Sequence, residues 1–428
     1  QVRGEVYPIN PKDEFVHGLK AYKSVVEVPG HIDLAVIVVN ASQVVDVFRQ
    51  CVEKKVGGAV IITAGFAEVG SEGASLQEEL VQLSRESGIR FVGPNCNGLW
   101  TSASRLNLTF WNLVKSGPVA FVSQSGTMGD YIFEVSETKG YGFSKIVTSG
   151  NQASLEVCDY LEYLADDDDT KVVALYLEGV RDGRRFLEAA RTATARKPVL
   201  AYKVGRTEAG SRAAATHTAS LTGSTQVFDA ACRQAGVQIC HDMLEMFDFA
   251  DTLAHQPLPP GNRVGIASGG GGFCVVTAEA CARVGLEVPV LDQEAQREVL
   301  QHVREFSPKP LNPLDLIARK SHLDYGAAIE ILAKQDYIDG LIIMPPYGGF
   351  RHSSSLEAMK GLVECCTTIA DIPRKYQKPV LAFARPEFRK MATGEILSRG
   401  QIPFYESPET CARAMKVLCS YAEYRRSR

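Results

Sequence analysis

The chain is dominated by short apolar runs rich in β-branched residues, each followed by a glycine or polar turn and then a stretch with helical spacing. Continuous apolar strands that alternate with helices are typical of parallel sheets, because helices then cover both faces of the sheet. The pattern predicts an α/β protein. Before residue 256 the expected strands are Leu34–Val39, Ala59–Thr63, Arg90–Val92, Val119–Ser123, Lys171–Leu177 and Val199–Val204.

The alternation of expected strands and helices is interrupted at two places, and these interruptions predict the domain boundaries. Trp100–Ser116 reads as irregular, and Gln256–Gly261 is a proline-rich linker that suits neither helix nor strand. After the linker the strand–turn–helix pattern restarts. A chain of 428 residues also exceeds what a single hydrophobic core normally serves. We expect three α/β domains, at residues 1–104, 115–255 and 262–420.

Composition excludes several classes of function. The balance of 46 basic against 50 acidic residues argues against a nucleic-acid partner. No apolar run is long enough to cross a bilayer and no signal-peptide pattern is present, so no membrane partner is expected. The 11 cysteines form no C-x-x-C pair, which argues against zinc and fits reduced thiols in the cytoplasm. We expect no metal site, and we interpret Asp166–Asp169 as an exposed turn.

The most informative segment surrounds His217. Residues 210–224 are almost all small, with hydroxyls and glycines, and offer few large apolar groups at helical spacing. This composition favours a mobile loop that lets an imidazole approach a reactive centre. The residues alone leave a catalytic and a merely hydrogen-bonded loop histidine equally open. The other histidines are scattered without ligand spacing, and we interpret them as surface or structural.

A second segment, Ser123–Gly129, follows an expected strand and opens an expected helix. Free N–H groups and hydroxyls at a helix N-terminus form an anion site, because the unpaired donors and the helix dipole favour negative charge. Serine and glycine equally suit a plain N-cap with a tight turn. Both interpretations stay open.

Further polar segments lie where strands are expected to end. Ile61–Phe66 and Gly93–Gly98 fall at the carboxyl edge, where open α/β sheets bind ligands, although Gly93–Gly98 also fits a simple turn. Glu178 ends a buried strand, where it can orient an imidazole or cap a helix. Ser268–Phe273 contains four glycines without dinucleotide-binding spacing, so its role stays open.

Together these segments resemble the α subunit of NDP-forming acyl-CoA synthetases. That family includes ADP-forming acetate–CoA ligases and is related to the succinyl-CoA synthetase α subunit. The resemblance covers nearly the whole chain and implies a Rossmann-like CoA-binding domain followed by two flavodoxin-like, doubly wound parallel-sheet domains. The segments that carry it are Val6–Lys12, Ile62–Glu68, Gly93–Gly98, Ser123–Gly126, Ser149–Asn151, Tyr176–Gly179 and Thr216–Ser220.

The resemblance also implies roles for single residues. His217 is the histidine phosphorylated during turnover, and Glu178 is the acidic residue that supports it. The positions that hold phosphate or phosphohistidine are Ser123, Ser125, Gly126 and Thr127. The positions that bind CoA are Lys12, Ala64, Gly65, Phe66, Asn95 and Cys96, the last two near its thiol. Gly150 and Asn151 lie beside the acyl group.

The implied reaction converts acyl-CoA, phosphate and NDP into carboxylic acid, CoA and NTP through an acyl phosphate and a phosphohistidine. CoA or acyl-CoA and phosphate are then substrates of this chain. NDP or NTP with Mg²⁺ is expected on an ATP-grasp β subunit or β half, since nothing in this sequence resembles an ATP-grasp domain. The alternative is a non-catalytic acyl-CoA-binding regulatory module.

The chain departs from the family pattern at three places. The usual amino-terminal strand and glycine-rich turn are missing before Gln1, so we expect a truncated start with reduced CoA affinity. Ala219 replaces a glycine after His217, which we expect to restrict the loop. The neutral pair Ala153-Ser154 occupies an acidic position, which we expect to alter acyl specificity.

Overall fold

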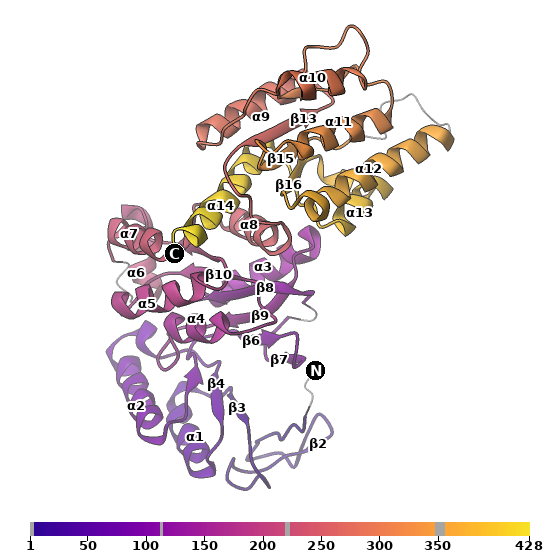
Figure 1. Cartoon of the computed structure of the whole chain (residues 1–428). Coiled ribbons are helices and arrows are strands. Elements are labelled where there is room, and N and C mark those ends of the chain that lie inside the picture. Colours follow the sequence, from indigo (N-terminus) through magenta and orange to yellow (C-terminus); the bar gives the residue numbers. More distant parts are fainter. Residues whose placement is uncertain (1–3, 112–113, 219–222, 347–355) are drawn as a thin grey trace. The chain divides into compact units, whose positions relative to one another are not determined.

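The computed structural model describes residues 4–111, 114–218, 223–346 and 356–428, of which 215–218 are described by their backbone alone. The chain divides into two compact units, Gln1–Met246 and Phe247–Arg428. Both combine parallel sheets with helices, so the predicted α/β class is confirmed (Figure 1).

The first sheet of unit 1 has three parallel strands in the order β3-β4-β5, namely β3 (Leu34–Ile37), β4 (Gly58–Ile61) and β5 (Phe91–Val92). The helices of this region are α1 (Ala41–Lys54) and α2 (Ser71–Ser87), and the short 3-10 helix η1 (Ala67–Val69) precedes α2. A small antiparallel hairpin joins β1 (Phe15–Val16) to β2 (Leu19–Lys20). Phe48 and Phe91 meet edge-on in the core beneath the sheet.

The second sheet of unit 1 has seven strands in the order β12-β11-β10-β8-β9-β6-β7. Its five parallel members are β8 (Ser116–Ser123), β9 (Phe143–Thr148), β10 (Val172–Leu177), β11 (Val199–Lys203) and β12 (Gln238–Cys240). β10 is buried along its whole length, as the continuous apolar run predicts.

Helices cover both faces of this sheet (Figure 1). The helices α4 (Val157–Ala165), α5 (Gly183–Thr194) and α7 (Thr225–Ala235) pack against one face. On the other face α3 (Gly126–Lys139) contacts β8 and β9. The helix α8 (Met243–His255) runs across the boundary between the units.

The expected mobile loop around His217 is wrong over residues 210–218, because they belong to α6 (Glu208–Thr218). Three consecutive alanines begin at Ala213, and alanine has the highest helix propensity of all residues. An ion pair of 2.8 Å between Arg212 and Glu208, one turn apart, adds to the helix. Residues 219–222 lie outside the described residues.

The stretch from Trp100 is not irregular at its start. β6 (Gly98–Thr101) pairs antiparallel with β9, and β7 (Leu106–Asn107) pairs with β6. The strands within residues 98–107 therefore belong to the seven-stranded sheet and not to the three-stranded sheet. The predicted boundaries of the three domains stay predictions, although residues 256–261 are neither helix nor strand.

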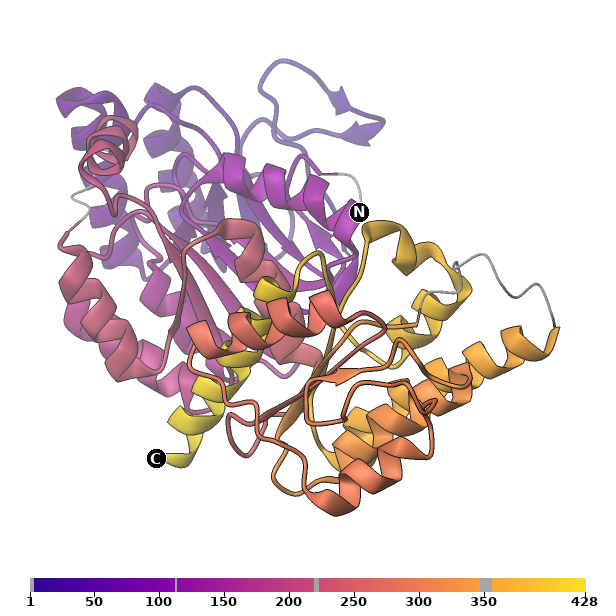
Figure 2. The same cartoon turned by 90° about the horizontal axis from the view of Figure 1, so that it is seen from above.

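Unit 2 contains one parallel sheet in the order β14-β13-β15-β16-β17. Its strands are β13 (Val264–Ser268), β14 (Leu314–Asp315), β15 (Gly340–Ile343), β16 (Val380–Phe383) and β17 (Phe404–Tyr405). Its helices are α9 (Gly271–Arg283), α10 (Gln293–Leu300), α11 (His322–Lys334), α12 (Leu356–Tyr376), η2 (Pro386–Lys390), α13 (Ala392–Arg399) and α14 (Pro408–Arg426). α11 and α12 lie on one face, and α9 and α14 lie on the other (Figure 2).

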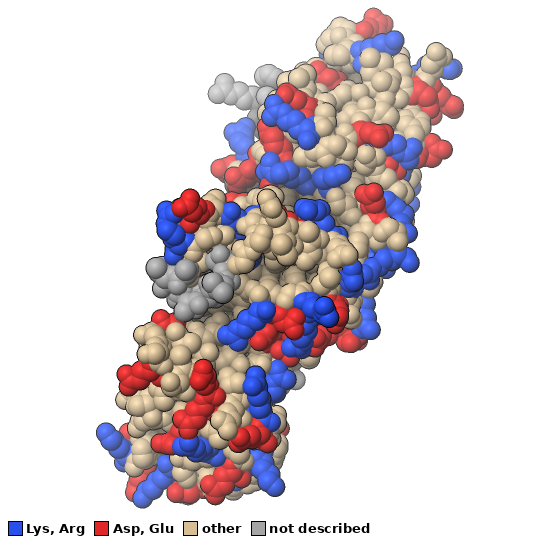
Figure 3. Space-filling view, turned by 90° about the vertical axis from the view of Figure 1, so that its left-hand side faces the viewer, with Lys and Arg blue, Asp and Glu red and all other residues tan. Residues whose placement is uncertain are grey.

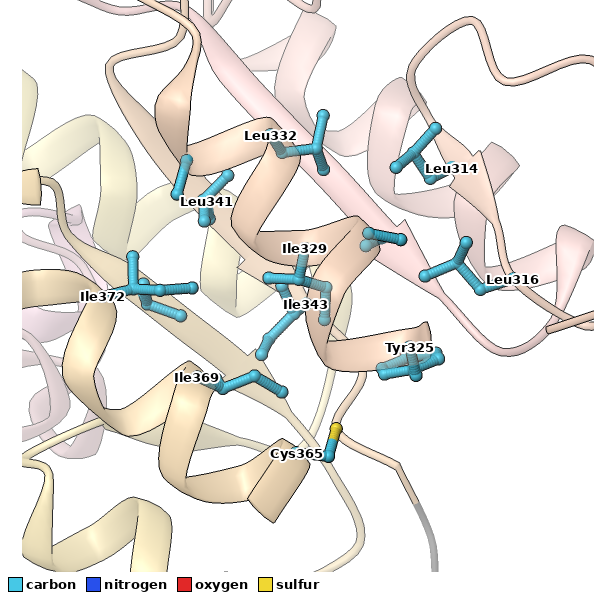
Figure 4. Close-up of a cluster of buried hydrophobic side chains, with 14 of the residues drawn as sticks. Leu314, Leu316, Tyr325, Ile329, Leu332, Leu341, Ile343, Cys365, Ile369 and Ile372 are labelled. Carbon is cyan, nitrogen blue, oxygen red and sulfur yellow. The ribbon is translucent and has the colours of Figure 1, made fainter. Parts of the chain in front are cut away.

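The core of unit 2 lies between α11, α12 and the sheet. Ile329 of α11, Ile343 of β15 and Ile369 of α12 are fully buried in one cluster (Figure 4). In the first turn of α11, by contrast, Leu323 is 46% exposed. One helix thus carries both a buried and an exposed aliphatic side chain.

The surface agrees with the nearly balanced composition. Basic and acidic side chains are interleaved on the face drawn in Figure 3. In the described part of the chain, no helix combines the length and the apolar composition that crossing a membrane requires. All cysteines are free and buried.

We expect Ile329→Ala to lower the free energy of unfolding by about 2–5 kcal/mol, because it removes buried methyl groups and leaves a cavity. Leu323→Ala on the same helix is the control, and it is expected to cost less because nearly half of that residue is already in water. Urea unfolding of both variants measures the difference. Equal losses would show that the cluster does not stabilise unit 2 as described.

Candidate functional site

The parallel register of unit 1 places the ends of four strands side by side. Ser123 of β8 pairs with Thr148 of β9 and with Tyr176 of β10, and Leu177 pairs with Lys203 of β11. The segments that follow these strands therefore emerge at one edge of the sheet, where open α/β sheets bind ligands.

The predicted phosphate-binding segment forms the turn from β8 into α3. Ser125 is the N-cap, and its Oγ accepts the Met128 N–H at 3.4 Å. Ser123 Oγ donates to the Ser125 carbonyl at 2.6 Å and is fully buried. Thr127 is exposed in the first turn. The helix start is thus an N-cap and also presents N–H groups that have no acceptor within the helix, so the structural and anion-binding interpretations are compatible.

Gln124, which the sequence analysis leaves without a role, fastens this turn to Glu178. Its Nε2 donates to the Gly179 carbonyl at 2.7 Å, and its Oε1 accepts the Gly179 N–H at 2.9 Å and the Glu178 N–H. Glu178 is only 6% exposed. The backbone of Glu178, whose side chain is buried, is therefore held by the residue that precedes the N-cap of α3.

Lys203 braces the same edge from the other side of Glu178. Its Nζ donates to the carbonyl oxygens of Glu178 and Val204, both at 2.7 Å. The side chain is buried, and burial lowers the pKa of its ammonium to about 8, with the nearby Arg206 adding to the effect and Glu178 opposing it. A single lysine at the end of an apolar strand is the only sequence signal for this contact.

The predicted acyl-side segment, Gly150 and Asn151, packs on the segment after β5. Gly150 has φ +54°, and a Cβ there would lie 2.2 Å from the Asn95 carbonyl oxygen. Asn151 donates its backbone N–H to the Pro94 carbonyl at 2.9 Å, and its Oδ1 accepts from Asn95 Nδ2 at 3.2 Å. Only glycine permits this approach of two backbones. The structure thus brings Asn95, Gly150 and Asn151 together.

The segment with Ala64, Gly65 and Phe66 adjoins the same region, because Asn95 donates its N–H to the Thr63 carbonyl at 2.9 Å. Ala64 is exposed, whereas Phe66 is fully buried.

Two of the predicted CoA-binding residues, Cys96 and Lys12, differ from the others in the surroundings of their side chains. Cys96 is 3% exposed and donates to the Ile61 carbonyl, and burial raises the pKa of its thiol to about 11. Its side chain therefore faces the core. Lys12 is exposed near the hairpin, and within the described residues no hydrogen bond joins it to the other CoA-binding positions.

Two further residues, to which the sequence analysis gives no individual role, shape this edge. Arg181 follows Glu178 and donates to the carbonyls of Asn151 and Gln152 at 2.8 and 2.9 Å. Asn97 lies against the start of α3, since a Cβ on Gly126 would be 2.8 Å from its Oδ1. Asn97 lies within the predicted segment Gly93–Gly98, and Arg181 lies two residues after the segment Tyr176–Gly179.

The His217 position lies near the carboxyl end of α6, a helix that begins soon after β11 and contacts η1. The imidazole is not among the described side chains, and Ala219 lies outside the described residues.

The neutral pair Ala153-Ser154, which occupies the acidic position of the family pattern, makes structural contacts. The Ala153 N–H donates to the Gly93 carbonyl at 3.0 Å, and Ser154 Oγ lies 3.0 Å from Ser84 Oγ.

In unit 2 the glycine-rich segment after β13 opens α9. A Cβ on Gly271 would lie 2.7 Å from Asp315 Oδ2, and Gly270 precedes the helix without a side-chain cap. The close carboxylate gives one structural reason for glycine, and the functional interpretation stays open.

The edge of unit 1 thus combines a helix start with unpaired N–H groups, a buried acidic residue and two backbone segments in close contact. This arrangement suits a reaction in which a negatively charged group forms, moves and must be held in place. Preorganised donors and charges supply that electrostatic stabilisation.

Comparisons with known proteins agree on one family. Residues 1–101 match the family model of a CoA binding domain, and residues 116–253 match that of a succinyl-CoA ligase like flavodoxin domain. The chain is 40% identical over 423 residues to the acetate–CoA ligase (ADP-forming) II subunit alpha of Pyrococcus furiosus. This match covers 98% of the chain and 90% of the relative.

Two further relatives extend the match. Acetate–CoA ligase (ADP-forming) I of Archaeoglobus fulgidus is 36% identical, and the match spans 98% of this chain but 59% of that longer protein. A structure described as dinucleotide forming acetyl-coenzyme A synthetase 1 of Ca. Korarchaeum cryptofilum, in complex with phosphate and ADP, has a TM-score of 0.88 and 33% identity. It covers 99% of this chain and 90% of its own.

We expect Lys203→Met to lower the free energy of unfolding by about 1–3 kcal/mol, because the two carbonyl oxygens lose their buried donor. Chemical denaturation measures the loss. Lys171→Met, at an exposed position before β10, is the control and is expected to change little. If both variants were as stable as the wild type, the lysine would not brace the edge.

Proposed function

The chain belongs to the family of ADP-forming acyl-CoA ligases and matches its alpha subunits, and we propose that it carries the phosphohistidine of such an enzyme. The reaction interconverts acyl-CoA, phosphate and NDP with carboxylic acid, CoA and NTP. Because the relatives bear the names of ligases, they support this catalytic interpretation over a regulatory module that only binds acyl-CoA.

The observation that carries the proposal is that Gln124, just before the N-cap of α3, holds the backbone of Glu178 and Gly179, so that a buried acidic residue follows β10 next to this helix start. A helix N-terminus attracts a phosphoryl group, whereas a carboxylate beside it repels one. A phosphorylated histidine between them resolves this conflict, since its ring can be stabilised by the carboxylate while its phosphoryl oxygens face the helix. We assign this histidine to His217.

The proposed reaction has three steps. A phosphate oxygen attacks the thioester carbonyl, the carbon–sulfur bond breaks, and CoA leaves as the acyl phosphate forms. The neutral imidazole of His217 then attacks phosphorus, and the carboxylate leaves. Finally an oxygen of the NDP β-phosphate takes the phosphoryl group and frees the imidazole. These transfers depend mainly on positioning and on charge stabilisation.

The phosphate site of the proposal consists of Ser123, Ser125, Gly126 and Thr127. Gly150 and Asn151 border the acyl group, since they lie against Asn95. For CoA, the proposal relies on the backbone of residues 64–66 and 95–96 rather than on the buried Cys96 thiol. Lys12 stays in the proposal as an exposed cation for the CoA phosphates.

The nucleotide requires a second protein part. Relatives named as alpha subunits support a partner subunit, and we propose that it is an ATP-grasp β subunit or β half that binds NDP or NTP with Mg²⁺. The small-molecule partner is a carboxylic acid. We place the protein in the cytoplasm, because its cysteines are free and buried, as in a reducing compartment.

The direct test of the phosphohistidine uses the chain together with its nucleotide-binding partner and ATP radiolabelled on its γ-phosphate. We expect label on the chain that is labile in acid and stable in base, as for phosphohistidine. His217→Ala is expected to abolish it, because no other nucleophile is assigned to this site.

The matched control is His241→Ala, which removes another histidine of unit 1, at an exposed position. It is expected to keep full labelling. Label that persists in His217→Ala would assign the nucleophile to another residue, and absence of both label and acyl-CoA-dependent ATP formation in the wild type would favour the regulatory alternative.

Glu178→Gln tests the supporting carboxylate with little change in shape. We expect the rate of phosphohistidine formation to fall about tenfold to a hundredfold, the range for loss of a hydrogen bond to a charged group. Rapid-quench labelling measures the rate, and Glu188→Gln, on the exposed side of α5, serves as control. An unchanged rate in Glu178→Gln would remove the carboxylate from the mechanism.

A further inference from the structure

Glu68 lies in η1, between the strand β4 and the helix α2, and its carboxylate joins two segments of the proposed site. Its Oε1 accepts the N–H of Gly65 at 2.6 Å and the N–H of Phe66 at 3.1 Å. Its Oε2 accepts from Asn151 Nδ2 at 2.5 Å. One oxygen thus holds the CoA-side backbone and the other holds the acyl-side amide.

All three partners of Glu68 are donors, so the side chain must act as an acceptor through both oxygens. Only an ionised carboxylate does this, because a protonated carboxyl or an amide presents a donor at one position. Burial raises the pKa of Glu68, but the hydrogen bonds from Asn151, Gly65 and Phe66 outweigh it, and the net pKa is lowered.

The orientation of the Asn151 amide is fixed from several sides. Its Nδ2 also donates to Gln77 Oε1 at 2.9 Å, and its Oδ1 accepts from Asn95 Nδ2 at 3.2 Å. A rotated amide would place its oxygen against the Glu68 carboxylate, which repels it. Glu68 therefore helps to fix the orientation of the Asn151 side-chain amide, with Nδ2 toward Glu68 and Oδ1 toward Asn95.

The backbone that Glu68 holds has little freedom to move. Gly65 has φ +106°, and a Cβ there would lie 3.0 Å from Ala41 Cβ. Phe66 is fully buried, and its carbonyl oxygen would be 2.0 Å from a Cβ on Gly73. Because this backbone is tightly packed, we expect a displacement of the Glu68 carboxylate to move residues 65–66 as well.

The same turn touches the helix that bears the proposed nucleophile. α6, which contains the His217 position, contacts η1, of which Glu68 is the central residue. Segments assigned to CoA and to the acyl group thus meet at the Glu68 carboxylate, whereas α6 only contacts the short helix that carries it.

We propose that Glu68 is a positioning residue that couples the CoA-side segment Gly65–Phe66 to the orientation of Asn151 at the acyl group. The inference rests on the proposed function. Glu68 contacts the CoA-side backbone and the acyl-side amide but no proposed reacting atom, so it acts on the steps that involve CoA and the acyl group through these contacts. Phosphoryl exchange between His217 and the nucleotide needs neither of these groups and should not depend on Glu68.

The test compares two half-reactions in the complex of the chain with its nucleotide-binding partner. One is exchange of phosphoryl between ATP and ADP through the phosphohistidine, and the other is formation of acetyl phosphate from acetyl-CoA and phosphate. For Glu68→Gln we expect kcat/KM for acetyl-CoA to fall about tenfold or more, while phosphoryl exchange stays within about twofold. Glu72→Gln, on the exposed start of α2, is the matched control and should match the wild type in both.

A double-mutant cycle separates coupling from general disruption. In Glu68→Gln combined with Asn151→Asp, the amide can donate to a carboxylate and the pair is complementary again. We expect the loss in the double variant to be smaller than the product of the losses in the two single variants, because the residues interact. Thermal unfolding of each variant checks that the fold is retained.

Two results would overturn the inference: losses that multiply in the cycle, or a Glu68→Gln variant that either keeps both half-reactions or loses both equally. Failure of the proposed function has a different signature, because the wild-type complex would then show neither half-reaction.

Discussion

The hydrogen-bonded register of the parallel strands in unit 1 is the constraint on which the site depends. Because β8 pairs in parallel with both β9 and β10, Ser123 lies directly beside Thr148 on one side and Tyr176 on the other. A shift of one residue in either pairing would turn buried side chains toward the opposite face of the sheet. The apolar faces of the helices that cover the sheet oppose such a shift, so the core and the site are fixed by the same interactions.

Backbone contacts then connect this edge to the three-stranded sheet. Gly150 admits the carbonyl of Asn95 at a distance that any side chain would prevent, and Arg181 ties the next two carbonyls to the loop after β10. Most of these links run from a side chain or N–H to a backbone atom. They fix the course of the chain and leave the identity of many side chains free, which suits a family whose members share short motifs.

The sequence predicted the strands and their α/β order, because buried parallel strands appear as continuous apolar runs. It also predicted which segments lie at the carboxyl edge. It missed α6, since small residues were interpreted as flexible although alanine favours helix, and it missed β6 and β7, which are short and antiparallel. Gln124 had no local signal, because its partner Gly179 lies 55 residues away. The roles assigned to single site residues stay predictions.

The burial of the cysteines has a consequence for thioester chemistry. Cys96 adjoins the proposed CoA-side segment, yet its pKa of about 11 leaves on the order of one thiol in ten thousand ionised at neutral pH. The thiolate is the nucleophile of a cysteine, so burial and the raised pKa together make this sulfur a poor acceptor for an acyl group in transthioesterification.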